Sequence, residues 1–543
     1  MHRSGSGQRS LKSNLIPAYR CCRSLIETER AYMNILDWIN VGKVSAERDD
    51  DLVNYFYDNG VLRAVLASNS SFLVLGRKGA GKTAVFRYLQ ENPHEYLRDT
   101  DILVSLSFED YNWKVHSLLR NTETADSLAY KQSWRFVILV EVIKAHVSRC
   151  KKDGVAVPTP IASAQKLLEK LFDHPLPSIY QLIGRKLLGL SKVKLPKAGL
   201  DLEEGNFDSL EVSGGEISFD EVESDNDIRT CLAQNIGNII SYMEKAIAQT
   251  TPCRYRTIIC FDRVDEAWDD VSLEVSRRVL SGLVSAADSL TAKYSEIMRP
   301  IVFLREDIFS VLPLNDSNKL REDCGALLKW GRDDLFKLLI RRLSYFAELN
   351  GQPPVDDLEA LFDKNEMRQR SKPPNYLLKR SMMRPRDMIC FLSRTIDAMH
   401  DSVNDPFADT SNVFSQIAVE AIYQAESGYS EWLKQELLDE WSVQRPSIIQ
   451  LLSAIQNHAS TQFSRADLEA QLAKLEIEFT PAGMLDDLRF LFANSVIGFK
   501  IGDSTAWRYR CFYPSQGFIE SDTYKVHDGL IRALNLKEPR DIA

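Results

Sequence analysis

The sequence lacks a long apolar segment. No run reaches the roughly 18 apolar residues that a helix needs to cross a bilayer. The first 30 residues contain several arginines and one lysine but no apolar core of the kind that a secretory signal requires. We therefore expect a cytoplasmic protein with no membrane partner.

Cysteine pairs at metal-binding spacing are missing as well. The nine cysteines are odd in number, and none follows another in a C-x-x-C pattern. Cys21 and Cys22 are adjacent, whereas the others stand alone, as Cys260 does inside an apolar run. This distribution predicts reduced thiols rather than a disulfide framework or a structural zinc site.

An excess of positive charge is also absent. The formal net charge is −9, so the chain as a whole would repel a polyanion. Residues 445–543 contain eleven basic and twelve acidic side chains, which gives a net charge of −1. DNA binding would therefore require a local basic patch.

The remaining composition is that of an ordinary globular protein. Of its 543 residues, 44% are hydrophobic and 26% are charged. A single hydrophobic core rarely organises a chain of this length, so we expect about two to four domains.

One motif carries a specific chemical prediction. The pattern G-x-x-x-x-G-K-[ST] is met by Gly76, Arg77, Lys78, Gly79, Ala80, Gly81, Lys82 and Thr83. It follows an apolar run at 72–75, read as a strand, and precedes a helical pattern at 84–90. Glycine-rich backbone and a helix N-terminus present amides to phosphate, so the motif predicts a phosphate-binding (Walker A) loop. Lys82 would contact the β- and γ-phosphates of ATP, and the Thr83 hydroxyl would bind Mg²⁺.

A second element is expected to hold the metal. The apolar strand predicted at 256–261 ends in Asp262, as a Walker B strand would, and this carboxylate would bind Mg²⁺ mostly through water. Asp265 and Glu266 follow within one turn, and either could polarise the attacking water. We slightly favour Glu266, and the alternative for the whole segment is a solvated acidic turn.

Two arginines are candidates for contacting the phosphates. Arg305 ends the strand predicted at 301–304 and would lie at the same edge of the sheet. The alternative is an ion pair at a helix N-terminus between Arg305 and Glu306 or Asp307. Arg386 opens a helix after Pro385 and could cross the phosphates from a helical lid; a plain helix start with proline is the alternative.

These elements predict an α/β fold, a P-loop NTPase parallel sheet with a helical lid and a C-terminal winged-helix-like domain. We expect a helical lead-in at 1–50 with a helix at about 14–41, and a core at 51–315 that opens with a helix at 51–66. A lid and connector would occupy 316–442. The last domain, 443–543, would contain three short helices at 448–455, 464–475 and 482–492, then a wing of strands at 496–500 and 507–512.

The core contains a charged insert, 150–227. Basic residues at 185–197 are followed by residues 201–227, which contain eleven Asp or Glu and no basic residue. A solvated loop that neutralises itself is the simpler interpretation. A regulatory flap over the nucleotide or a partner is the other.

Taken together, these features resemble the STAND and AAA+ branch of P-loop ATPases. Residues 262–266 are similar to the D-G-[LV]-D-E variant of NACHT-type members, with Arg263 where glycine is usual. Residues 76–84, preceded by 46–49 and 55–56, and the tail 496–530 are similar to bacterial P-loop ATPases found beside defence and mobile-element genes. The resemblance implies ATP-driven switching or oligomer formation.

Three functions follow as hypotheses. The first is a slow ATPase switch that signals through its C-terminal domain to a protein partner or to copies of itself. The second is a DNA-binding helper ATPase of the origin-recognition or transposition type. The third, a kinase acting on a small substrate, is disfavoured by the helical lid and the additional C-terminal domain.

Overall fold

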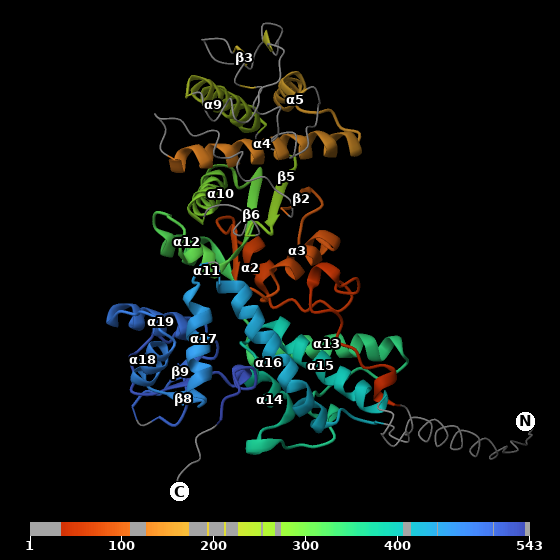
Figure 1. The fold of residues 1–543 in the computed structure, drawn as a ribbon. Coiled ribbons are helices and arrows are strands. Elements are labelled where there is room, and N and C mark those ends of the chain that lie inside the picture. The colour runs from red at the N-terminus through yellow and green to blue at the C-terminus, as the bar shows by residue number, and fades with distance from the viewer. Residues whose placement is uncertain are drawn as a thin grey trace, which may run out of the picture.

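The computed structural model describes residues 34–108, 126–172, 190, 193–194, 211–212, 226–250, 254–265, 273–404, 414–442, 444–502 and 504–537. Figure 1 shows a sheet covered by helices in the upper half of the molecule and a mainly helical half below it. The helix expected at 14–41 lies largely outside the described residues.

A parallel sheet forms the core of the upper half. Its strands are β1 (Leu73–Gly76), β2 (Asp101–Ser107), β5 (Arg256–Asp262), β6 (Met298–Arg305) and β7 (Gly325–Leu327), in the order β2-β5-β6-β1-β7. Every neighbouring pair is parallel. The predicted α/β class is confirmed, whereas β7 was not predicted because three residues are too few for a periodic signal.

Helices cover both faces of the sheet. Along β5, Ile259 and Phe261 pack in one hydrophobic cluster with α4 (Asp126–Lys152) and α10 (Leu273–Tyr294). Ile258 and Cys260 alternate to the opposite face, in a cluster with α2 (Val61–Ala67) and α3 (Lys82–Glu91). A strand buried on both faces reads as one continuous apolar run, which explains why β5 was predictable from its sequence.

Part of the charged insert is helical and packed. Helix α5 (Thr159–Phe172) buries Leu167 and Leu168 in the cluster that contains α4 and α9 (Asn226–Ala248). The solvated-loop interpretation is therefore wrong for α5. The short pair β3 (Val193–Lys194) and β4 (Glu211–Val212) also lies in the insert, of which residues 173–189, 191–192, 195–210 and 213–225 are outside the described part.

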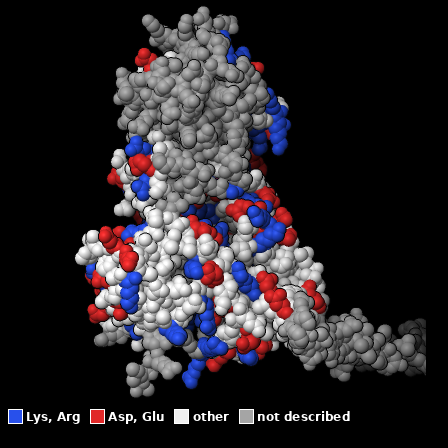
Figure 2. Space-filling view, viewed as in Figure 1, with Lys and Arg blue, Asp and Glu red and all other residues white. Residues whose placement is uncertain are grey.

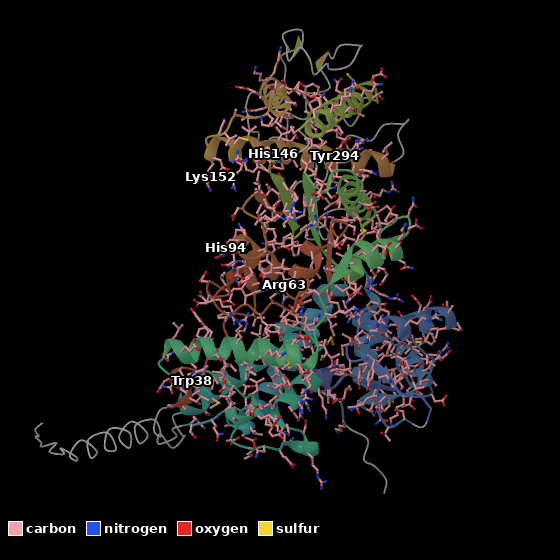
Figure 3. The ribbon with its side chains drawn as sticks, turned by 180° about the vertical axis from the view of Figure 1, so that it is seen from behind. Trp38, Arg63, His94, His146, Lys152 and Tyr294 are labelled. Carbon is pink, nitrogen blue, oxygen red and sulfur yellow. The ribbon has the colours of Figure 1, made fainter. Side chains whose placement is uncertain are left out.

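The segment before the phosphate loop differs from its prediction. The helix expected at 51–66 begins only at Val61, because Gly60 precedes it with φ of +89°, a left-handed conformation that glycine adopts at little cost. Residues before α2 instead form turns and the short 3-10 helices η2 (Ile35–Asp37) and η3 (Ala46–Arg48). Ile35 belongs to the hydrophobic cluster of the lower half, and Figure 3 shows Trp38 beside the helices of that half.

The lower half is built from a series of helices. After α11 (Glu306–Ser310) and α12 (Ser317–Cys324), the chain forms α13 (Arg332–Leu349), α14 (Pro373–Arg380), α15 (Pro385–Asn404) and α16 (Val419–Trp441). None of the helices in the described part of the chain is long and apolar enough to span a bilayer.

The C-terminal region follows the predicted helix order but not the predicted wing. Its helices are α17 (Ser447–His458), α18 (Arg465–Lys474) and α19 (Pro481–Ala493). Strand β9 (Ile497–Phe499) pairs with β10 (Tyr524–Val526), which also pairs with β8 (Gln462–Phe463). Residues 507–512, expected as the second wing strand, contribute only the single bridge between Arg508 and Phe499.

Gly282 permits the close crossing of α10 and α4. A Cβ added at this position would lie 2.6 Å from the Cβ of Tyr130. We expect Gly282→Ala to lower the free energy of unfolding by about 1–3 kcal/mol through overpacking, as measured by urea denaturation. Gly237→Ala in α9, where no described atom would lie within 4 Å, is the matched control and should stabilise by about 0.5–1 kcal/mol. Equal effects of the two substitutions would contradict this account.

Candidate nucleotide-binding site

The phosphate loop joins β1 to α3. Gly79 and Gly81 have φ of +77° and +96°, conformations open to glycine that turn successive amides toward one concave side. The indole Nε1 of Trp330 donates to the carbonyl of Ala80 at 2.8 Å, which fixes the loop against the chain that enters α13. The loop therefore has the backbone shape of an anion site at a helix N-terminus.

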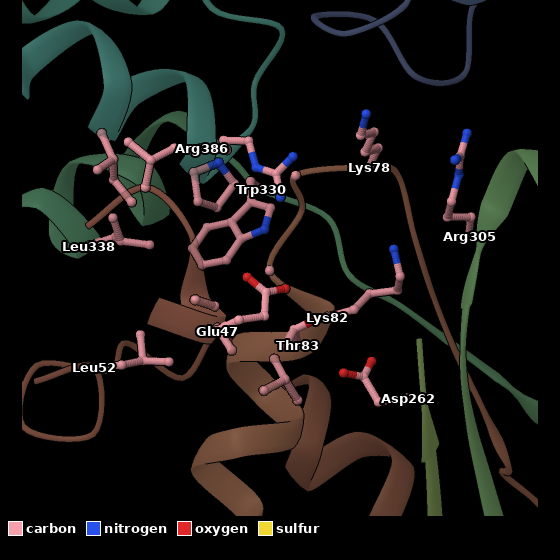
Figure 4. A pocket seen from close by; sticks show the side chains of 18 of the residues that line it. Glu47, Leu52, Lys78, Lys82, Thr83, Asp262, Arg305, Trp330, Leu338 and Arg386 are labelled. Atoms are coloured by element: carbon pink, nitrogen blue, oxygen red, sulfur yellow. The ribbon is translucent and has the colours of Figure 1, made fainter. Parts of the chain in front are cut away.

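The Walker B candidate lies beside this loop. Asp262, at the carboxyl end of β5, is 2% exposed and lines the same cavity as Thr83 (Figure 4). Burial raises the pKa of Asp262 to about 7, and the neighbouring Asp265 adds to this, while Lys82 and Thr83 oppose it. The structure thus brings together the two residues predicted to bind the metal.

Asp262 and Thr83 fit a magnesium ion. Within the described residues, the buried Oδ2 of Asp262 has no hydrogen-bond donor. A buried carboxylate oxygen without a partner is costly, and a hard cation would satisfy it. A carboxylate and a hydroxyl are oxygen donors of the kind that Mg²⁺ prefers.

Lys82 lies across the loop. Its Nζ donates to the carbonyls of Gly76 and Arg77 at 3.2 and 3.4 Å. Burial lowers the pKa of Lys82, and the nearby Asp265 opposes that shift. The ammonium group is thus held where it faces the carboxylates of the Walker B turn.

The turn after β5 contains Arg263 at the position where the similar motif usually has glycine. Arg263 has φ of +59°, so this arginine adopts the left-handed conformation that glycine would favour. Asp265 lines the cavity next to the loop. Glu266, the base that we slightly favoured, lies outside the described residues.

Arg305 lines the same cavity and is also ion-paired. At the end of β6 it contacts Asp307 at 2.7 Å and Glu440 of α16 at 3.5 Å. The ion pair considered as the alternative therefore exists with Asp307. Glu306 instead pairs with Arg321.

The lid contributes two arginines. Arg386, at the start of α15, lines the cavity and pairs with Glu436 of α16 at 3.0 Å. Arg384 is 5% exposed and donates to the carbonyl of Lys78 at 3.2 Å and to Glu440 at 3.4 Å. Sequence reasoning selected Arg386 and missed Arg384, although both belong to the same R-P-R-D segment.

Arg77 was predicted as part of the backbone loop around the phosphates, and its side chain contacts the C-terminal region. Its guanidinium donates to the carbonyl of Ala493, at the end of α19, at 2.7 Å. Only its backbone belongs to the phosphate loop, so a side-chain contact to nucleotide is not its role in this arrangement. Arg77 instead joins the loop to the C-terminal region.

The cavity continues from the loop into an apolar end. It has a volume of about 290 Å³. The apolar and aromatic side chains that line it come from distant parts of the chain and include Val44, Leu52, Tyr57, Trp330, Leu338 and Ile389. A flat, apolar ring such as a nucleobase matches this lining.

Two arginines hold residues 41–49 in place; this segment lines one side of the cavity and is called its N-terminal wall. Arg87 of α3 donates to the carbonyls of Ala46 and Asp49. Arg342 of α13 donates to the carbonyl of Val41 at 2.6 Å and to the Asp49 carboxylate at 3.3 Å. The wall is therefore attached both to the helix after the phosphate loop and to the lid.

Comparisons with known proteins give three kinds of similarity. The FunZ-associated C-terminal helical domain matches residues 333–438, which span α13 to most of α16. The putative transposon gamma-delta 80.3 kDa protein of Escherichia coli (strain K12) is 23% identical over 521 residues, which cover 91% of this chain and 67% of that protein.

Two solved structures are similar to this chain, with low TM-scores. The Aeropyrum pernix ORC1 protein in complex with DNA is 12% identical with a TM-score of 0.33, covering 82% of this chain and 86% of that one. Cdc6p from Pyrobaculum aerophilum is 10% identical with a TM-score of 0.30, covering 90% of this chain and 96% of that one.

The ionisation of Asp262 has a consequence for stability. Its carboxyl ionises near pH 7 in the folded chain and near 3.8 when unperturbed, so its charge opposes folding increasingly as pH rises between these values. Asp262→Asn carries no charge. The difference in free energy of unfolding between Asp262→Asn and wild type should therefore increase in favour of the variant by at least about 1 kcal/mol from pH 5 to pH 8. Both proteins are measured without magnesium or nucleotide. A difference that is the same at both pH values would contradict the burial argument.

Proposed function

We propose that this protein binds ATP and magnesium at the loop of residues 76–83 and hydrolyses the nucleotide slowly. The observation that carries the proposal is that Thr83 and the buried Asp262 line one cavity with the left-handed glycines of the loop. The groups predicted to bind the metal therefore lie beside the residues predicted to bind phosphate.

The loop would bind the triphosphate with its backbone and one lysine. Amides of residues 79–83 would donate to phosphate oxygens, and Lys82 would leave the carbonyls of Gly76 and Arg77 to contact the β- and γ-phosphates. Thr83 and Asp262 would hold the magnesium ion. That ion, when bound, neutralises charge on the β- and γ-phosphate oxygens.

Hydrolysis also requires a group that orients water. Asp265 lines the cavity, and Glu266 is the adjacent carboxylate, so either would accept the proton of a water that attacks the γ-phosphorus. Arg305 would stabilise the charge that develops on the transferred phosphoryl group. The apolar end of the cavity would accept adenine.

The nucleotide state would be transmitted to the C-terminal region. Arg77 connects the loop to Ala493, and Trp441 at the end of α16 contacts Phe490 of α19 with ring centroids 5.1 Å apart. Changes at the phosphates therefore have a short path to α19. We propose a switch that signals to a protein partner or to further copies of this chain, with a role in defence or mobile elements. The similarity to a protein named for a transposon supports the mobile-element role.

A DNA-binding helper ATPase is the second candidate, because the same relative is named for a transposon. The surface of the C-terminal region favours a protein partner. Asp486 on α19 is exposed and, with Asp487, pairs with Arg445. In Figure 2 basic and acidic side chains are interspersed on the visible face rather than gathered in a basic stripe. A DNA-reading surface would need such a stripe.

The first test removes the phosphate-binding lysine. Lys82→Ala should lower kcat for ATP hydrolysis by at least about 100-fold, because the charge that meets the γ-phosphate is lost. The rate of phosphate release by the purified protein measures this kcat. Lys337→Ala, an exposed lysine on α13, is the control and should hydrolyse ATP like wild type. Hydrolysis that survives in Lys82→Ala would reject the proposed site.

The second test concerns DNA. A gel shift with duplex DNA at low and high salt should detect no salt-dependent complex, since the C-terminal region lacks net positive charge. The double variant Lys500→Ala, Arg508→Ala should behave like wild type. Tight binding that weakens steeply with salt, and that these substitutions abolish, would establish the DNA-binding alternative instead.

A further inference from the structure

The end of α16 faces the phosphate loop with carboxylates. Glu436 contacts Lys78 at 3.9 Å and Arg386 at 3.0 Å. Glu440 contacts Arg384 at 3.4 Å and Arg305 at 3.5 Å. Four cations from the loop, the sheet edge and the lid therefore converge on two carboxylates of one helix.

Glu436 and Glu440 lie near the C-terminal end of α16, where negative charge is unfavourable. The last turns of α16 contain acidic residues and no basic residue, although the C-terminus of a helix carries partial negative charge. Glu440 is only 8% exposed, and an unpaired carboxylate buried to that degree would be strongly destabilising. The surrounding cations provide the compensation.

The cations of this cluster are the groups that the phosphates of a nucleotide would also attract. Lys78, Arg305 and Arg386 line the cavity beside the loop, together with Glu440. Two anions cannot both be fully paired with the same cations. Carboxylate and phosphate therefore compete for them.

We infer, on the basis of the proposed nucleotide binding, that Glu436 and Glu440 are intramolecular competitors of the nucleotide phosphates. Phosphate replaces them on Lys78, Arg305 and Arg386, and the end of α16 is released. Arg305 retains Asp307 at 2.7 Å, so the departure of Glu440 leaves this guanidinium paired.

Release of the end of α16 also alters its contacts with the C-terminal region. Helix α16 ends at Trp441, which packs against Phe490 of α19, and α17 begins at Ser447. Arg445 lies in this connection and pairs with Asp487 of α19. The exchange of carboxylate for phosphate therefore changes the attachment of α17 and α19, not only the affinity of the site.

The experiment measures nucleotide affinity in the full-length chain by calorimetry with Mg²⁺ and ATPγS. Glu436→Gln, Glu440→Gln and the double variant keep the side-chain size and remove the competing charge. We expect each to bind ATPγS more tightly than wild type, the double variant by at least about 5-fold. Glu431→Gln, an exposed residue on the same helix paired with Lys434, is the control and should leave the affinity unchanged.

Hydrogen exchange gives a second measurement. Amides of residues 438–447 should exchange faster in wild type when ATPγS is bound, and already faster in the double variant without nucleotide. Glu436→Gln, whose side chain is partly exposed, carries the test if the double variant does not fold.

Two results overturn the inference. Unchanged or weaker ATPγS binding in folded Glu436→Gln and Glu440→Gln, with normal wild-type binding, rejects competition while leaving the proposed function standing. Failure of wild type itself to bind ATPγS rejects the proposed function, and the competition inference with it.

Discussion

The buried Asp262 and Thr83 line one cavity, where the two halves of the proposed phosphate site meet. Thr83 belongs to the first turn of α3, and Asp262 ends β5, a strand separated from β1 by β6. The pKa of this buried carboxylate is raised to about 7, which is an unfavourable arrangement for a purely structural group. The proposed binding of a cation and a polyanion would explain why such a carboxylate lies there.

A second constraint links the sheet to the helical half. Acidic side chains on α16 pair with cations from the phosphate loop, β6 and the start of α15, while Arg77 reaches the end of α19. Charge pairs with little exposure require close positioning of every partner. A ligand with several negative charges would disturb this set directly. In the proposed function, the same contacts would take part both in nucleotide binding and in transmission of the bound state.

The local parts of this arrangement could be predicted from sequence. Continuous apolar runs identified the strands β1, β5 and β6, motif spacing indicated Lys82 and Thr83, and the end of an apolar strand indicated Asp262. The contributions of Arg384, Glu436 and Glu440 could not be predicted, because each depends on helices that meet the loop more than 300 residues along the chain. The helix expected at 51–66 begins only at Val61 because Gly60 interrupts the pattern. The first wing strand was predicted correctly, but its partner was placed at 507–512 because three-residue β10 carries almost no periodic signal.

The most direct test of the account is a crystal structure of the full chain with magnesium and ATPγS. We expect the phosphates to accept the amides of residues 79–83, with Lys82 on the β- and γ-phosphates. The metal should lie beside the Thr83 hydroxyl and the Asp262 carboxylate. Nucleotide bound elsewhere, with no metal beside Thr83 and Asp262 and the loop without phosphate, would contradict the account.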